Sequence, residues 1–272
     1  MASLLLLNFG TYAETHRFKA LGRDRGFLDT DALDAASPGD LVQSDGVQKR
    51  NDLGAELYSF YGLSAKVWRS KLSDDTFKAA FEKWMIEALK SPVHCIYIAG
   101  HHWTGALHTS WGEESSYFYA EFDTDKQQLL FGVSSDQIML DTTTLRSECR
   151  LIVGFGCNVA TAIHSQQYQS FFDSRPVVLA WDQSIRIPKR SEPSVNERFF
   201  DFLETRATTD TRVPKTDRLV WFYDNDSMQL VRAWGRATKN WFSGQARARD
   251  KDGNFYKFKK DKKTGEMEPV KA

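Results

Sequence analysis

The chain has 272 residues, 36 basic and 36 acidic side chains, 41% apolar residues and 13% aromatic residues. This length is enough to bury a full hydrophobic core, and the many aromatic residues exclude a disordered protein. A net charge of zero gives no reason to expect that the chain as a whole binds nucleic acid or anionic membranes.

Two further features concern the cellular compartment. The apolar run at residues 4–7 is too short for a secretion signal, and no stretch reaches the roughly 18 apolar residues of a membrane-spanning helix. Cys95, Cys149 and Cys157 are odd in number and scattered, which indicates a reducing compartment rather than a disulfide framework. We therefore predict a soluble, cytoplasmic protein that does not contact a membrane.

The first part of the chain is expected to alternate strands and helices. Residues 4–9 form an apolar run of strand length, and residues 47–61 have apolar side chains at helical spacing. Residues 63–68 alternate like a strand. A helix is then expected to begin at Ser73, a favourable N-cap residue, and to end before Pro92. Such alternation is typical of a mostly parallel sheet with helices on both faces.

Two central strands are predicted next, at residues 93–99 and 151–156, because both are β-rich apolar runs bounded by glycine. Between them, residues 117–122 and 129–133 are expected to form an inserted hairpin.

After the second central strand we expect a helix at residues 159–172 and a buried strand at residues 176–181. A further helix is expected around Phe199, because Ser194 and Glu197 are spaced as a capping box.

The composition changes near the end of the chain. Residues 228–272 contain twelve Lys and Arg against five Asp and Glu, so their surplus of seven positive charges balances a deficit of seven in residues 1–227. A helix and a hairpin with its turn at residues 251–254 are expected here. We therefore predict a main domain and a basic C-terminal extension, which is solvated, docks a partner protein or contacts nucleic acid.

Reactive side chains follow both predicted central strands. His101 and His102 come after the first strand, and Cys157 comes after the second. Functional residues of an open α/β sheet collect at the carboxyl ends of its strands. A thiol near a helix N-terminus is activated by positive potential, and an imidazole can take its proton and later protonate a leaving amine. The sequence therefore predicts a nucleophilic cysteine with a histidine base.

These motifs resemble those of the caspase-like cysteine peptidases, in particular the CHAT-domain proteases. Residues 97–101 are similar to the family's apolar strand that ends in Gly-His, and residues 151–160 to an apolar strand followed by Cys, Asn and small residues. The interval from His101 to Cys157 is 56 residues, close to the roughly 50 residues of caspases. The resemblance covers most of residues 1–205.

The resemblance implies a three-layer αβα sandwich, the caspase-like fold, for residues 1–227, and a cysteine endopeptidase that acts on protein substrates without a cofactor. In this mechanism Cys157 attacks the peptide carbonyl, His101 is the acid and base, and the N–H groups of His102 and Cys157 hold the oxyanion. The family usually has glycine after the catalytic histidine. His102 at that position leaves open which imidazole is the base.

Three residues are candidates for substrate binding. Phe155 stands two residues before the cysteine, where relatives that cleave after Arg or Lys often have Asp. Trp181 and Asp182 lie where the family's substrate-binding strand begins. Asp182 could receive a basic substrate side chain, whereas Arg186 could favour an acidic one. The resemblance also implies activation by a partner protein or ligand, in a prokaryotic stress or antiviral defence pathway.

Two other functions stay open. One is a catalytically silent caspase-like module that binds other proteins. The other is a different thiol hydrolase, or a metal-binding protein that uses His101, His102 and His108. The spacing of these histidines is not that of a helical ligand pair, and no carboxylate or second cysteine completes the set. We therefore predict no metal and no cofactor.

Overall fold

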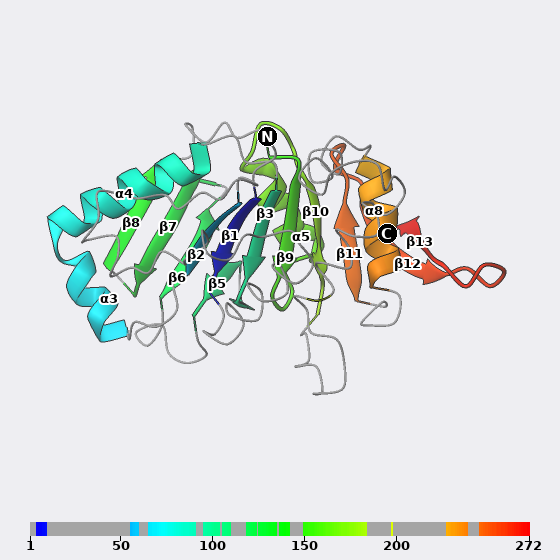
Figure 1. Cartoon of the computed structure of the whole chain (residues 1–272), viewed down its shortest axis with the longest axis horizontal. Coiled ribbons are helices and arrows are strands. Elements are labelled where there is room, and N and C mark those ends of the chain that lie inside the picture. The colour runs from blue at the N-terminus through cyan, green and yellow to red at the C-terminus, as the bar shows by residue number, and fades with distance from the viewer. Residues whose placement is uncertain are drawn as a thin grey trace.

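A computed structural model describes the chain in twelve parts: residues 4–9, 55–59, 65–90, 95–103, 105–109, 118–123, 125–134, 136–141, 149–183, 197, 227–238 and 245–272. These parts form an α/β structure with two sheets (Figure 1). One sheet has eight strands, both parallel and antiparallel, and the other has five antiparallel strands. The sequence prediction of an α/β fold is confirmed at this level.

Five parallel strands form one side of the large, eight-stranded sheet, in the order β2-β1-β3-β9-β10. They are β1 (Leu4–Asn8), β2 (Ala55–Ser59), β3 (Cys95–Ala99), β9 (Leu151–Phe155) and β10 (Val177–Trp181). Four of them, all but β2, were predicted as strands. The chain passes from one side of β1 to the other between β2 and β3, and ligands of doubly wound sheets bind at the strand ends beside such a switch.

Two predictions in the first part of the chain were wrong. Residues 55–59, expected within a helix, form β2 because they pair along their whole length with β1, a partner that local periodicity does not reveal. Residues 65–72, expected to begin as a strand, form helix α3 (Ala65–Leu72). Trp68 and Leu72 are buried there at a spacing of four residues, as in a helix with one buried face. Val67, just before Trp68, is exposed, although its apolar side chain had contributed to the expected strand pattern.

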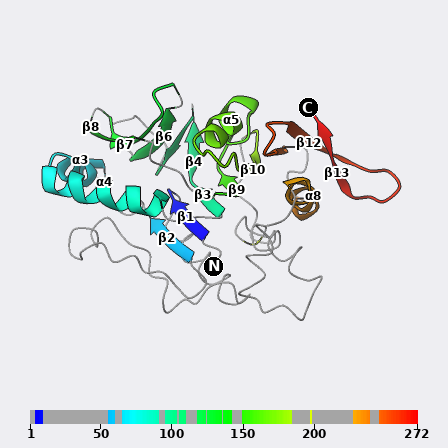
Figure 2. The ribbon, with the colours of Figure 1, turned by 90° about the horizontal axis from the view of Figure 1, so that it is seen from above.

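The helix predicted from Ser73 is confirmed as α4 (Asp75–Lys90). Its N-cap is Asp74 rather than Ser73, because the Asp74 carboxylate accepts hydrogen bonds from the N–H groups of Thr76 and Phe77. Both α3 and α4 pack against the second sheet (Figure 2).

The second sheet is inserted between β3 and β9 and contains the predicted hairpin. Its strands are β4 (His101–Trp103), β5 (Ala106–His108), β6 (Tyr119–Asp123), β7 (Gln128–Val133) and β8 (Asp136–Asp141). The β6–β7 hairpin is confirmed. The strands β4 and β5 were missed, because three residues are too few to show a period of two.

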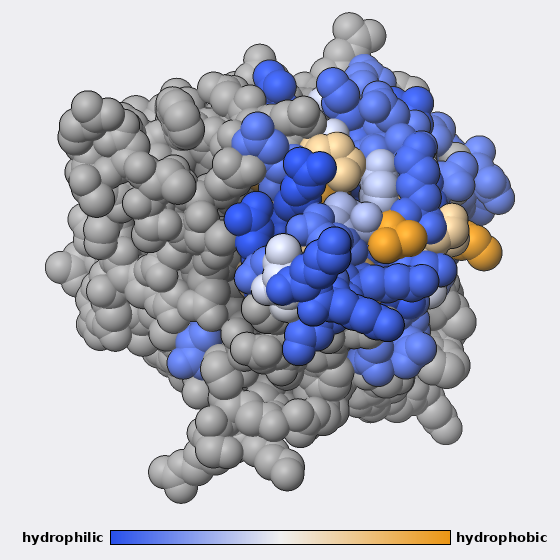
Figure 3. All heavy atoms as spheres, turned by 90° about the vertical axis from the view of Figure 1, so that its right-hand side faces the viewer, coloured by the Kyte–Doolittle hydropathy of each residue, from blue (hydrophilic) through white to orange (hydrophobic). Residues whose placement is uncertain are grey.

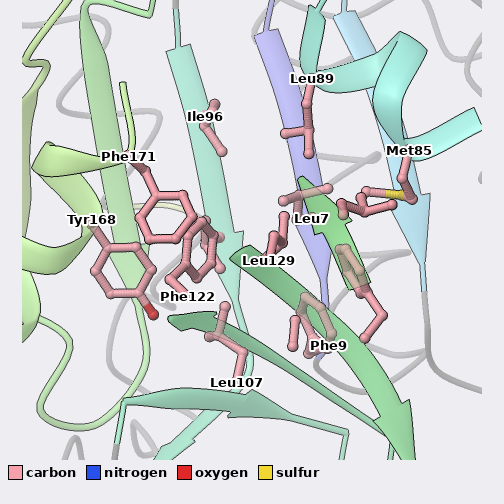
Figure 4. Packing of buried hydrophobic residues seen from close by; sticks show 14 of the residues in the cluster. Leu7, Phe9, Met85, Leu89, Ile96, Leu107, Phe122, Leu129, Tyr168 and Phe171 are labelled. Carbon is pink, nitrogen blue, oxygen red and sulfur yellow. The ribbon is translucent and has the colours of Figure 1, made fainter. Parts of the chain in front are cut away.

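The core lies between the large sheet, the second sheet and helix α5 (Ala162–Ser170) (Figure 4). Side chains from all three meet there: Leu7, Phe9 and Ile96 from the large sheet, Leu107, Phe122 and Leu129 from the second sheet, and Tyr168 and Phe171 from α5 or its end. Helix α8 (Ser227–Ala237) covers the opposite face of the large sheet (Figure 2). The helix predicted around Phe199 lies outside the described residues.

The C-terminal residues continue the large sheet, which the sequence did not predict. The expected turn is present, between β11 (Ala246–Arg249) and β12 (Phe255–Lys260), and an unpredicted strand β13 (Met267–Lys271) follows. Because β11 pairs with β10, the basic extension is joined to the parallel strands by a continuous hydrogen-bonded ladder.

The described surface at the C-terminal end of the sheet is mainly hydrophilic (Figure 3). Exposed lysines of β12 and of the following turn contribute to it: Lys259, Lys260, Lys262 and Lys263. None of the described helices has the length and apolar character needed to cross a membrane.

Candidate active site

The two motifs meet at the carboxyl ends of neighbouring parallel strands. Ala99 of β3 pairs in register with Phe155 of β9, and the N–H of Gly100 donates to the carbonyl of Phe155 at 2.9 Å. His101 and Cys157 each follow this pair by two residues, so both leave the sheet at the same edge. The structure thus brings together the two segments that the sequence selected.

A glycine allows these segments to approach closely. A Cβ atom on Gly156 would lie 2.8 Å from the carbonyl oxygen of Gly100 and 3.0 Å from the Cβ of His102. Any side chain at position 156 would push the histidine and cysteine segments apart.

Cys157 is the only one of the three cysteines that is not buried. Cys149 donates to the carbonyl of Leu151 inside the core, and burial raises the pKa of its thiol to about 12. Cys95 is also fully buried, in β3. Of the three thiols, therefore, only that of Cys157 is in a position to react with a substrate.

Cys157 stands in a turn and not directly at a helix N-terminus, which differs from the expectation. Four residues separate it from Ala162, the first residue of α5, whose N-cap is Thr161. The N–H of Asn158 donates to the carbonyl of Gln183, and that of Ala160 to the carbonyl of Trp181. These bonds fix the turn against the end of β10.

The same bonds bear on the oxyanion site. Because the N–H groups of Asn158 and Ala160 already donate to carbonyls, neither is a ready donor to a substrate oxyanion. The assignment of this role to the backbone N–H groups of Cys157 and His102 stays a prediction.

His102 is fully buried beside α5. Its Nδ1 lies 2.8 Å from the carbonyl oxygen of Cys157, and its ring meets that of His164 edge-on, with the centroids 4.9 Å apart. Burial, together with smaller contributions from the neighbouring His164 and His108, lowers the pKa of His102 to about 3, against the opposing effect of the Cys157 carbonyl. His102 is therefore neutral at physiological pH and unsuited to gain a proton during catalysis.

His101 is placed differently from its neighbour. It is partly exposed, and successive side chains of a strand such as β4 point to opposite faces. It pairs across the strands with His108 of β5. Of the two imidazoles left open by the sequence, His101 is thus the better candidate for the base.

Two of the three predicted substrate contacts belong to an aromatic cluster. The Trp181 ring is 1% exposed and packs against Trp234 of α8, with the centroids 4.8 Å apart, and against Phe155 at 5.7 Å. In this conformation Trp181 supports the site from inside the core and does not face a substrate. Phe155 is partly exposed.

Asp182 forms an ion pair with Arg247 of β11, with 2.6 Å between Oδ2 and the guanidinium. Burial raises the pKa of the Asp182 carboxyl, and the charge of Arg247 opposes this shift. Two buried acceptors nearby, Asp182 Oδ1 and Gln245 Oε1, have no hydrogen-bond partner among the described residues. Binding of a basic substrate side chain by Asp182 stays a prediction, and Arg186 lies outside the described residues.

The sequence did not single out His164, Arg247 and Gln245 as part of this region. His164 lies within the helix predicted at residues 159–172, and nothing in its local pattern marks its approach to His102. The two C-terminal residues come close only because β11 pairs with β10.

Within the described ranges, no three His, Cys, Asp or Glu side chains are gathered so that they could hold a metal ion. Comparison of the chain with models of known protein families and with curated protein sequences finds no match.

Proposed function

We propose that the chain is a caspase-like cysteine endopeptidase in which Cys157 is the nucleophile and His101 the general base. The observation that supports the proposal is that both residues follow the paired ends of two adjacent parallel strands, β3 and β9, and that Cys157 is the one cysteine that is not buried. A thiol and an imidazole at one sheet edge suit acyl transfer from a peptide bond, in which the imidazole takes the proton of the thiol.

The arrangement of layers supports the same family. Five strands of the large sheet are parallel, α5 covers one face, and α8 covers the other. We propose that these layers form the three-layer caspase-like sandwich that the two sequence motifs imply. The apolar strands agree with a sheet that is covered on both faces.

The proposed activity is tested with an electrophilic peptide probe that alkylates catalytic cysteines. We expect a covalent adduct on the wild-type chain, at least tenfold slower labelling of His101→Ala, and no adduct on Cys157→Ala. Cys149→Ala is the matched control, since it removes a buried thiol and should keep the adduct. Absence of labelling in the presence of every activator tried would overturn the proposal.

The substrate preference follows from the surroundings of Asp182. Because its carboxylate is paired with Arg247, we propose that a basic substrate side chain would share or replace this partner. A library of peptide substrates tests this, with a preference for Arg or Lys expected in the wild-type chain and lost in Asp182→Asn.

We further propose that a partner protein or ligand activates the enzyme in the cytoplasm, in a stress or antiviral defence pathway of a prokaryote. This part rests on the motif resemblance alone. Co-expression with candidate activators, followed by detection of a cleaved protein, tests it, and cleavage must depend on Cys157. Contact with nucleic acid, if any, would come from the basic C-terminal strands and would weaken with added salt.

A further inference from the structure

Two imidazoles hold consecutive carbonyl groups of the turn that carries Cys157. His102 Nδ1 lies 2.8 Å from the carbonyl oxygen of Cys157, and His164 Nδ1 lies 3.0 Å from that of Asn158. A carbonyl oxygen only accepts hydrogen bonds, so Nδ1 carries the proton in both rings. The turn is thereby tied to β4 by one histidine and to α5 by the other.

These two hydrogen bonds hold a turn whose backbone conformation is unusual. Asn158 has a φ of 63°, in the left-handed region that residues other than glycine seldom adopt. The two histidines fix the peptide groups on either side of Asn158, because they bind the carbonyls of residues 157 and 158. The direction in which the Cys157 side chain leaves the turn therefore depends on both rings.

Packing alone does not account for His102. Its side chain is 0% exposed, and its Nε2 has no hydrogen-bond partner among the described residues. A buried nitrogen without a partner destabilises the fold, and an apolar side chain of similar size would avoid that cost. What the imidazole adds, and an apolar ring would not, is the N–H that faces the Cys157 carbonyl.

We infer that His102 and His164 are positioning residues that together orient the Cys157 turn for reaction. The inference rests on the proposed role of Cys157 as nucleophile. Neither imidazole is assigned a contact with the reacting atoms, and both act through the backbone of the turn.

The groups around His102 agree with a neutral donor. His164 and Tyr168 of α5 and His108 of β5 face it, together with the Cys157 carbonyl. None of them is an anion that would stabilise a charged imidazolium. The ring therefore keeps a single proton, and the bond to the carbonyl places that proton on Nδ1.

Two variants at position 102 separate the hydrogen bond from the packing. His102→Asn places an amide N–H close to the position of Nδ1, whereas His102→Phe keeps a ring of similar size without a donor. We expect the kcat of peptide cleavage to fall about tenfold or more in His102→Phe with KM nearly unchanged, and to recover largely in His102→Asn. Equal activity of the two variants would overturn the inference.

His164 supplies a second pair, His164→Asn and His164→Phe, at a partly exposed position where either side chain can be accommodated. The same order of activities is expected. If His102→Phe does not fold, as judged by circular dichroism, this pair decides the question alone.

Two measurements that need no peptidase activity separate this inference from the proposed function. In the Phe variants we expect faster hydrogen exchange at the amides of Asn158 and Ala160, and an altered rate of Cys157 alkylation by iodoacetamide. Wild-type values in every Phe variant would overturn the positioning role. If iodoacetamide modifies Cys157 but no peptide probe does, the proposed function is wrong while the positioning role of the histidines is still decided by the exchange rates.

Discussion

Two polar clusters lie beside α5, and they differ in how completely their hydrogen bonds are made. At the turn between β11 and β12, the Asp250 carboxylate accepts four bonds, from the N–H groups of Asp252 and Asn254, the Asn254 amide and the Tyr256 hydroxyl. The neighbouring Arg249 is buried and donates to Ser165, Ala162 and Gly253. This cluster satisfies its polar groups.

The cluster around Cys157 does not satisfy its polar groups. His102 Nε2 and the Tyr168 hydroxyl are both buried without a hydrogen-bond partner among the described residues. Burial raises the pKa of the Tyr168 hydroxyl, so this group stays protonated. A buried polar network stabilises a fold when all of its groups are hydrogen-bonded. Buried polar groups without a hydrogen-bond partner destabilise the fold, so their presence needs another explanation. The contrast indicates that the hydrogen bonds of the β11–β12 turn stabilise the fold, and it agrees with the functional role proposed above for the Cys157 turn.

The largest effect is expected from removal of Arg249. Arg249→Met should lower the free energy of unfolding by about 3 kcal/mol or more, because three acceptors lose a charged donor and two of the three belong to α5. Denaturant unfolding measures the loss. Arg232→Met, at an exposed site of α8, is the matched control and should change stability by less than about 0.5 kcal/mol. Equal effects of both variants would remove the contrast between the clusters.

The second effect is a pH dependence of the free energy of unfolding that arises from the titration of His102. Its pKa is about 3 in the folded chain and 6.5 in the absence of these surroundings. Between these values the unfolded chain binds more protons, so the free energy of unfolding should fall as the pH is lowered from 6.5 toward 3. The slope approaches about 1.4 kcal/mol per pH unit. His102→Asn should lack this contribution, and an unchanged slope in that variant would contradict it.

The carboxyl group of Asp250 titrates in a different pH range from His102. Burial alone would raise the pKa of its carboxyl, but the hydrogen bonds from Asn254 and Tyr256 outweigh burial and hold the pKa below its ordinary value of 3.8. Its contribution is complete above that value and is lost only as the pH falls through the lower pKa of the folded chain. Asp250→Asn should therefore leave the slope between pH 4 and 6.5 unchanged, in contrast to His102→Asn.

The same comparison explains what the sequence could predict. The strands β3 and β9, which precede His101 and Cys157, were predicted because each is a short apolar run bounded by glycine, a signal contained in neighbouring residues. The strand β2 was missed because its partner β1 lies about fifty residues earlier in the chain. The approach of His164 to His102 was missed for a similar reason, since it depends on the packing of α5 against β4, and no local pattern encodes it.

The smallest effect is expected at Tyr168. Tyr168→Phe removes a buried hydroxyl that has no partner among the described residues, and it keeps the ring contacts with Phe122 and His102. We expect the free energy of unfolding to stay the same or to rise by up to about 1 kcal/mol. Tyr256→Phe is the matched control. Its hydroxyl donates to Asp250, so its loss should destabilise the fold by about 1 kcal/mol. If Tyr168→Phe destabilises the fold as much as Tyr256→Phe, the Tyr168 hydroxyl has a hydrogen-bond partner. The two clusters would then not differ in how completely their buried polar groups are hydrogen-bonded. Denaturant unfolding measures the change in the free energy of unfolding of both variants. Changes of opposite sign would show that the hydrogen bonds of the β11–β12 turn stabilise the fold, whereas the buried Tyr168 hydroxyl near Cys157 does not. This outcome would agree with the role proposed above for the Cys157 turn.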